Sequence, residues 1–543
     1  MLEQHLYVNA TFHTQWAGMP RATALWTRGE RILAVESPEE LRAHLTGPVE
    51  TVDLGGATVI PGLTDAHIHT ANYAREISAL DLRGTTSLPE ALARIRAHAA
   101  TLPDGAWIFG GRWDFNAWDV PVQPDRAALD SATGSHPAAL PSVDGHTVWA
   151  NSAALAAVGI DARTPDPVGG EIVRGPDGEP TGILRESAHA PLAEIMHGGA
   201  AGDLHSQLDR AQHRLLAVGL TGVHDFDGDE CRAAYASLRA EGKLRLRVHK
   251  SIPATSLERA IDAGWATGDG DAWLRTGPVK LFSDGALGSH SSHMGHPFPG
   301  EDGNTGIEVT PYLELLALVR RAAGAGIAVA THAIGDRANQ LVLDAYQDLL
   351  RHPLDAAPGR PGSSLPTHRP LRHRIEHAQH LRPEDVQRVA GLGVVPSMQP
   401  THCTTDIPLA STLLADRQLA SYAWRSLIDA GAWPAFGSDA PVELPHPLHG
   451  IHAAVTRQRH DGEPAGGWQP GERITVAEAI AGFTTGAARA SGEEALKGRL
   501  RPGMLADFTA LAADPHAVDP RDLRELPVTA TAVGGTLRYR NDS

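Results

Sequence analysis

The stretch that decides the fold is Asp65-Ala66-His67-Ile68-His69, which closes the apolar run of residues 57–63. Residues i and i+2 of a β-strand point to the same face, so His67 and His69 can reach one ion together. Imidazole is a common ligand of zinc and related metals. A histidine pair at this spacing also fits a surface or core role, so the assignment depends on the rest of the chain.

Four further candidate ligands each end an apolar run of their own. They are Lys280, His332, His377 and Asp439, in the stretches 277–284, 326–332, 373–377 and 433–439. A strand followed by a ligand at its C-terminal end, repeated along one chain, is how a parallel α/β barrel builds an active site. The pattern therefore favours a metal centre at the mouth of a barrel.

Three more apolar runs bounded by turn signals bring the number of expected buried strands to eight. They cover residues 220–226, 244–249 and 393–398. Helical patterns, such as that of residues 314–322, separate several of these runs. Eight strands alternating with helices predict an α/β protein with a (β/α)8 TIM barrel.

The remaining sequence predicts two additions to the barrel. Short β-like runs at both termini suggest one composite β-sandwich domain, built from residues 1–61 and 499–543. The barrel then takes residues 62–71 and 206–498. Between its first and second strands lie about 150 residues, far more than a normal βα connection holds. We expect residues 72–205 to form an inserted α+β cap domain over the barrel mouth.

Composition and charge restrict the partners and the location. The chain has 543 residues and a net charge of −17, which argues against nucleic acid or an anionic membrane as partner. No signal peptide or membrane-spanning stretch is visible. Only Cys231 and Cys403 occur, so no disulfide framework is implied. A cytoplasmic protein is expected, and a homo-oligomer stays open.

The order His-x-His, Lys, His, His, Asp on successive strands resembles the amidohydrolase superfamily of metal-dependent hydrolases. The branch that the chain resembles is amidohydrolase family 3, which includes N-substituted formamide deformylases. Residues 142–152, 280–289 and 331–336 carry the marks of this branch. The resemblance covers nearly the whole chain, and it is specific for the fold and the metal site rather than for the substrate.

The resemblance implies two divalent metals per chain, with Zn²⁺ expected. His67, His69 and Asp439 would hold one metal, and His332 and His377 the other. Lys280 would react with CO2, and its carbamate would bridge both metals. Burial among apolar residues lowers the pKa of a lysine and frees the neutral amine that attacks CO2. The alternative is a structural lysine paired with a carboxylate such as that of Asp284.

Other residues are candidates for catalysis and substrate binding. Asp439 can act as general base and then as general acid, although it could instead cap the helix that follows. His146 is expected in a turn of the cap, where it could donate to an oxyanion or serve only the loop. Trp113, Trp149 and His290 are candidate substrate contacts, while a structural role is the alternative for aromatic side chains of this kind.

The function that these residues predict is hydrolysis of a non-peptide C–N bond in a small amide, formamide or carbamoyl substrate. A mononuclear deaminase of the same superfamily is the first alternative. Such deaminases usually carry a glutamate three residues after the histidine of the fifth strand, and here that position is Gly335. A non-catalytic binding protein on the same fold is the second alternative, although such relatives typically lose metal ligands.

Overall fold

A computed structural model describes residues 2–541, apart from 46, 116–117, 143–146, 168, 193–194, 196–203 and 353–370. The chain divides into two units. The first comprises Met1–Thr70 and Asp209–Ser543, and the second comprises Ala71–Leu208.

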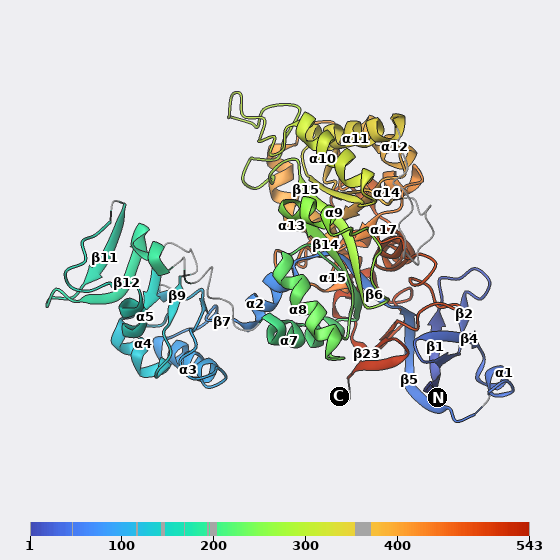
Figure 1. Ribbon diagram of the computed structural model, residues 1–543, viewed down its shortest axis with the longest axis horizontal. Helices are drawn as coiled ribbons and strands as arrows, with labels where there is room; N and C mark the ends of the chain where they lie inside the picture. The colour runs from blue at the N-terminus through green and yellow to red at the C-terminus, as the bar shows by residue number, and fades with distance from the viewer. Residues whose placement is uncertain are drawn as a thin grey trace. The chain divides into compact units, whose positions relative to one another are not determined.

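A parallel sheet of eight strands forms the centre of the first unit (Figure 1). In chain order its strands are β6 (Leu63–Ile68), β13 (Leu220–Asp225), β14 (Arg247–Pro253), β15 (Leu274–Phe282), β16 (Val329–Ala333), β17 (Arg374–His377), β19 (Val395–Met398) and β21 (Ala435–Phe436). Neighbours in sequence are neighbours in the sheet. The segment that follows β21 meets the end of β6 through two hydrogen bonds, from Asp439 N to His67 O (2.7 Å) and from His69 N to Ala440 O (2.9 Å). The predicted (β/α)8 barrel is therefore present.

Helices follow the barrel strands, as the alternating apolar pattern predicts. They are α7 (Leu204–Ala217), α8 (Asp229–Ala240), α9 (Leu257–Asp262), α10 (Tyr312–Gly324), α11 (Asp336–Arg351), α12 (Pro383–Gly391), α13 (Pro400–Leu413), α14 (Trp424–Asp429), α15 (Pro447–Thr456), α16 (Val476–Ala481) and α17 (Ala487–Ala490). Almost all residues of the short barrel strands are buried, polar ones included, as expected for a parallel sheet that is covered on both faces.

The first apolar run of the sequence is divided between two sheets. Its residues up to Pro61 end strand β5 (Glu50–Pro61) of the terminal sheet, and the barrel strand β6 starts at Leu63. Gly62 joins them, and a Cβ there would lie 2.4 Å from Thr221 Oγ1. The close approach of strand β13 leaves room only for glycine at this turn. The single strand that we expected before His67 is thus corrected to the short strand β6.

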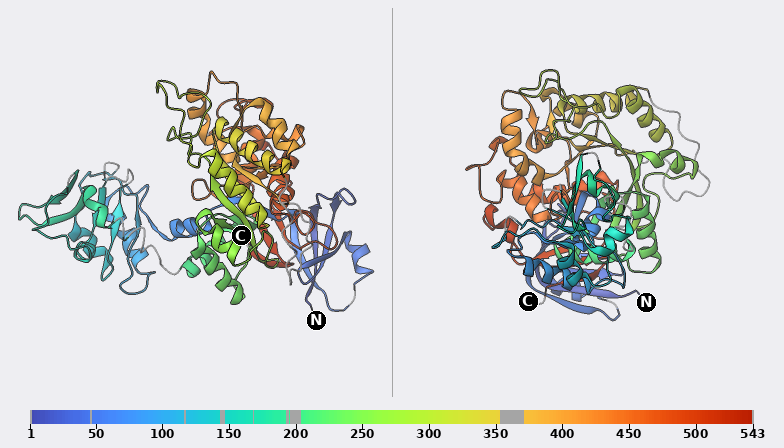
Figure 2. Two further views of the ribbon diagram at one scale, coloured as in Figure 1. Left: turned by 45° about the horizontal axis from the view of Figure 1, so that its top comes forward. Right: turned by 90° about the vertical axis from the view of Figure 1, so that its left-hand side faces the viewer.

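Both termini contribute strands to one eight-stranded sheet, so an extra sheet domain accompanies the barrel, while its form as a β-sandwich of residues 1–61 and 499–543 stays a prediction. Its strands are β1 (Gln4–His13), β2 (Arg21–Ala22), β3 (Ala24–Arg28), β4 (Arg31–Glu36), β5, β22 (Phe508–Leu511), β23 (Val528–Val533) and β24 (Thr536–Arg540). Strand β5 joins the two ends, because it pairs with β1 on one side and β22 on the other. The views of Figure 2 show these blue and red strands side by side. Phe12, Val59 and Phe508 lie in its core.

The second unit contains two small sheets and short helices. A four-stranded sheet has the order β11 (Gly170–Arg174), β12 (Pro180–Glu186), β10 (Thr147–Ala150) and β9 (Ala139–Pro141). Strands β7 (Leu80–Asp81) and β8 (Gly110–Gly111) form a second sheet. The helices are α2 (Thr70–Ser78), α3 (Leu88–Ala99), α4 (Arg126–Thr133) and α5 (Ser152–Ala157). Its position over the barrel mouth stays a prediction.

Two further expectations concern the whole chain. Cys231 and Cys403 are both buried and both free. Among the described residues, none of the helices combines the length and the apolar character that crossing a membrane requires.

Candidate metal centre

The predicted metal ligands converge at the carboxyl ends of the barrel strands. The rings of His67 and His377 lie 4.9 Å apart between centroids, and those of His332 and His377 lie 4.6 Å apart. Ligand atoms of His67, His69 and Asp439 all lie within 4.8 Å of one another. Side chains from strands far apart in sequence therefore meet in one place, as the carboxyl edge of a barrel requires.

Asp439 lies between the first two histidines. Its Oδ1 is 3.4 Å from Nε2 of His67 and also 3.4 Å from Nε2 of His69. The backbone of Asp439 is in the left-handed region (φ +59°), a conformation that is unfavourable for a residue with a side chain and that clusters at functional sites. The next helix, α15, has His446 as its N-cap, so Asp439 does not cap it.

Each of the four histidines is held through its Nδ1 atom. The partners are Glu376 Oε2 for His67 (2.6 Å), Asp227 Oδ1 for His69 (3.2 Å), Asp284 Oδ1 for His332 (3.0 Å) and Gln399 Oε1 for His377 (2.8 Å). A metal-binding histidine typically donates its second N–H to such an oxygen, which fixes the tautomer and the ring orientation. The arrangement leaves Nε2 of each ring as the nitrogen for a metal.

The partner of His67 belongs to a buried ionic network. Glu376 Oε1 accepts a hydrogen bond from Nε of Arg374 (2.7 Å), and both side chains are fully buried. Arg374 also donates to Ala66 O (2.6 Å) and to Ser397 Oγ (2.8 Å). A buried charge is tolerated only when it is paired and hydrogen-bonded. The network therefore fixes Glu376 at the barrel axis, where it orients His67.

Lys280 is the buried amine of the site. Its Nζ lies 4.9 Å from the ring centre of Phe226 and 5.0 Å from that of Phe282. Burial lowers the pKa of this ammonium from 10.5 to about 8. Asp284, the alternative partner, instead accepts from His332 and from the backbone N–H groups of Ile334 and Gly335. The described residues show no ion pair between Lys280 and Asp284.

The pKa values of His67 and His69 are shifted in opposite directions. Burial and the charge of Lys280 lower the pKa of His67 to about 4, so that ring is neutral. Its buried Nε2 has no hydrogen-bond partner among the described residues. Burial lowers the pKa of His69, but hydrogen bonds to Asp227 and Asp439 outweigh it and raise the pKa to about 9. A cation would displace that proton, because metal ligands must be deprotonated.

His402 is a neighbour of the site that sequence reasoning missed. It lies on α13, and its ring stacks on that of His377 at 6.0 Å between centroids. Its Nε2 is 3.8 Å from Asp439 Oδ2 and has no hydrogen-bond partner among the described residues. A polar residue on the first turn of a helix that directly follows barrel strand β19 is the signal that could have indicated it.

The candidate substrate contacts lie in other surroundings. Trp113 and Trp149 are both in the apolar core of the second unit, and their indole N–H groups donate to Leu140 O and Asp125 O. His290 lies in the connection between β15 and α10, pairs with Glu301 and stacks on Phe298 at 4.9 Å. His146 lies outside the described residues, as does the turn around it. The roles of these residues in substrate binding stay predictions.

A barrel that gathers four imidazoles, a carboxylate and a buried lysine at its carboxyl edge defines a class of metal-dependent hydrolases. The chain belongs to the amidohydrolase family, which matches residues 50–539. This membership supports a hydrolase and implies a metal ion. The donors fit such an ion, since the buried Nε2 of His67 has no hydrogen bond to the described part of the chain and lies 3.4 Å from Asp439 Oδ1.

Three similar proteins extend over nearly the whole chain. Protein LONG AFTER FAR-RED 3 of Arabidopsis thaliana is 34% identical over 98% of this chain and 91% of its own. The N-substituted formamide deformylase of Arthrobacter pascens is 31% identical over 98% of both chains. An uncharacterized metal-dependent hydrolase from Pyrococcus furiosus superposes with a TM-score of 0.75 at 25% identity, covering 94% of this chain and 100% of its own.

Proposed function

We propose that this chain hydrolyses a non-peptide C–N bond, of the amide, formamide or carbamoyl type, with Zn²⁺ ions held at the barrel mouth. The observation that carries the proposal is the set of four histidines whose Nδ1 atoms are all paired with side-chain oxygens. Such contacts to Nδ1 are typical of metal-binding histidines, because they orient each ring so that Nε2 can bind a metal. The similarity to a formamide deformylase supports the bond type.

The metals would be held by six side chains: His67, His69, Lys280, His332, His377 and Asp439. A divalent cation supplies Lewis acidity, which acidifies water and polarises a carbonyl group. Carboxylation of Lys280 would join its neutral amine to CO2 with loss of one proton, and the carbamate would add two oxygen ligands. Burial keeps a substantial share of this amine neutral near pH 8.

Asp439 is the candidate for proton transfer. Burial raises the pKa of its carboxyl, but the electrostatic influence of the neighbouring His67 and the hydrogen bond from His69 outweigh burial and hold the pKa well below its usual range. The carboxylate is therefore ionised, which is the form that a general base needs to accept a proton from the attacking water before giving it to the leaving nitrogen. The overall reaction converts an amide and water into a carboxylic acid and an amine. When the substrate is a formamide, the acid is formic acid.

The experiment is a substrate screen with matched preparations. Protein loaded with Zn²⁺, protein treated with a chelator and the Asp439→Asn variant are each offered N-substituted formamides, other N-acyl amines, carbamoyl compounds and dipeptides. We expect amine release from one of the first three classes, only with the metal-loaded wild type. Turnover restricted to dipeptides would refute the bond type, and equal turnover after chelation would refute the metal.

A further inference from the structure

We propose a second metal site, outside the barrel, made by His13, Asp514 and His516 of the terminal sheet. His13 ends strand β1, and the other two residues lie in the connection between β22 and the 3-10 helix η6 (Pro520–Glu525). Ligand atoms of the three side chains all lie within 4.8 Å of one another. None of the three belongs to the barrel site.

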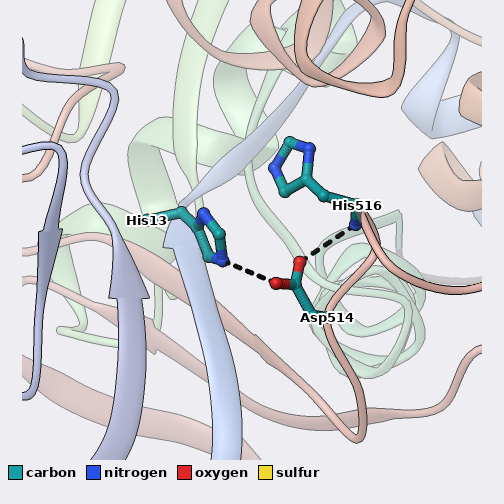
Figure 3. A group of neighbouring side chains, drawn as sticks. All are labelled: His13, Asp514 and His516. Carbon is teal, nitrogen blue, oxygen red and sulfur yellow. Dashed lines mark hydrogen bonds and ion pairs between the residues drawn. The ribbon is translucent and has the colours of Figure 1, made fainter.

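The carboxylate is the fixed member of the group. Asp514 Oδ2 lies 3.2 Å from Nε2 of His13, and Oδ1 accepts a hydrogen bond from the backbone N–H of His516 at 2.9 Å (Figure 3). Two ligands on one zinc-sized ion, each bound at about 2.0–2.1 Å, are separated by a distance close to that between His13 and Asp514. The pair is therefore already spaced for a shared cation.

The second imidazole completes the group from the solvent side. The rings of His13 and His516 lie 4.8 Å apart between centroids, at an interplanar angle of 37° (Figure 3). His516 is exposed, and its ring nitrogens make no hydrogen bond to any residue that the structure describes. Its side chain can therefore turn toward the carboxylate without breaking a hydrogen bond to the described residues.

The donor set selects the kind of ion. Two imidazoles and one carboxylate suit Zn²⁺, Ni²⁺ or Co²⁺, whereas Mg²⁺ and Ca²⁺ prefer oxygen ligands only. One charged neighbour opposes a cation, since NH2 of Arg21 lies 3.8 Å from Asp514 Oδ2. The Arg21 side chain is 67% exposed, so it can swing into solvent when an ion binds. Water would fill the remaining positions of the ion.

The site would join two segments that are 501 residues apart in sequence. An ion that binds only the folded protein stabilises it by mass action. Because one ligand ends β1 and the other two follow β22, the ion would hold together the two ends of the chain in the terminal sheet. The role that follows is structural, and it does not depend on the proposed activity.

The test counts metal ions in matched variants. After equilibrium dialysis against micromolar free Ni²⁺ or Zn²⁺, the wild type should hold one more ion per chain than His516→Ala or Asp514→Asn. His516 is exposed, so its replacement should leave the fold intact, and Asp514→Asn keeps the shape of the side chain. His460→Ala, a change of another exposed histidine, should keep the full count.

Two further measurements sharpen the result. Arg21→Ala should strengthen Ni²⁺ binding about twofold to fivefold, the size expected for an exposed like-charge contact. Backbone amides of residues 12–14 and 514–518 should exchange hydrogen more slowly with Ni²⁺, in the wild type but not in His516→Ala. Equal ion counts in the wild type, His516→Ala and Asp514→Asn would overturn the proposal, whatever the activity of the barrel.

Discussion

The barrel centre and the core of the second unit both bury large side chains, but of opposite character. At the barrel centre the buried groups are ionic, such as Arg374 and Glu376, and each has a hydrogen-bonded partner. In the second unit they are apolar, such as Trp113 and Trp149, which contact each other edge to face at 5.9 Å. Burial of charge is unfavourable for stability, whereas burial of indole is favourable. The difference indicates that the barrel centre is arranged for chemistry and the second core for folding.

The largest effect that would test this distinction is expected at Lys280. We predict that Lys280→Ala abolishes turnover and loses at least one metal, because the variant lacks the bridging oxygens that a carbamate supplies. Bicarbonate with short carboxylates should partly restore both. Metal analysis and amine release give the measurement, and Lys243→Ala, at a half-exposed lysine, is the control. Retained metal with normal turnover would show that Lys280 is structural.

The next largest effect is expected at Asp439. Asp439→Asn should lower kcat by about two to four orders of magnitude, the usual contribution of general acid–base catalysis. The amide has nearly the same shape, so the melting temperature should change little. The pH profile of kcat is the measurement. A variant as active as the wild type across the pH range would exclude this role.

For the second unit, the comparison predicts a loss of stability instead of a loss of metal. Trp149→Ala should destabilise this unit by about 3–5 kcal/mol, the usual effect of removing a buried aromatic side chain. Urea unfolding followed by limited proteolysis should show the unit opening earlier, while the metal content stays that of the wild type. If Trp149→Phe keeps stability but raises KM severalfold, Trp149 contacts the substrate. The core of the second unit would then serve substrate binding as well as folding.

A smaller effect is expected when the partner of a metal ligand is changed. Glu376→Gln should weaken metal binding about 10-fold to 100-fold, the range seen for such outer partners. Competition with a chelating dye measures it. Gln399→Leu, which removes the partner of His377, should weaken binding in the same way. Unchanged affinity in both variants would mean that the Nδ1 contacts serve the barrel core only.

The parts of this architecture that sequence could predict are those with local signals. Eight apolar runs, five of them ending in a candidate ligand, indicate barrel strands without knowledge of their neighbours. The division at Gly62 could not be predicted, because it depends on the contact with Thr221 on the next barrel strand. The histidine partners depend on register across strands, which a single run does not determine.

For His402 and the tryptophans, the sequence does not show which way the side chain faces in the folded protein. His402 reaches Asp439 only because α13 starts at the barrel mouth, and sequence does not show which way its first turn faces. A tryptophan in a pocket and one in a core have the same local pattern, so Trp113 gave no sign of its buried position. The histidine partners did leave one local signal, because a charged residue inside a buried strand, such as Glu376, indicates a buried polar network.

The last prediction concerns pH and follows from the lowered pKa of Lys280. Carboxylation needs the neutral amine, and burial lowers the pKa of this group from 10.5 to about 8. At a fixed concentration of dissolved CO2, the rate of carbamate formation in metal-free protein should rise about tenfold per pH unit below pH 8 and level off above it.

The lowered pKa of Lys280 also predicts how the free energy of unfolding changes with pH, and this change can be measured without an activity assay. Between about pH 8 and 10.5 the unfolded chain holds a proton on Lys280 that the folded chain has lost. The free energy of unfolding of the metal-free protein should therefore rise with pH in this window. Below about pH 8, where Lys280 is protonated in both states, the destabilisation from burying its charge should be complete. Carbamate is followed by ¹³C NMR with labelled CO2, and Lys280→Met, which has no amine, should lack both effects. A half-point near 10.5 would place Lys280 in a solvated environment and contradict its burial at the barrel centre.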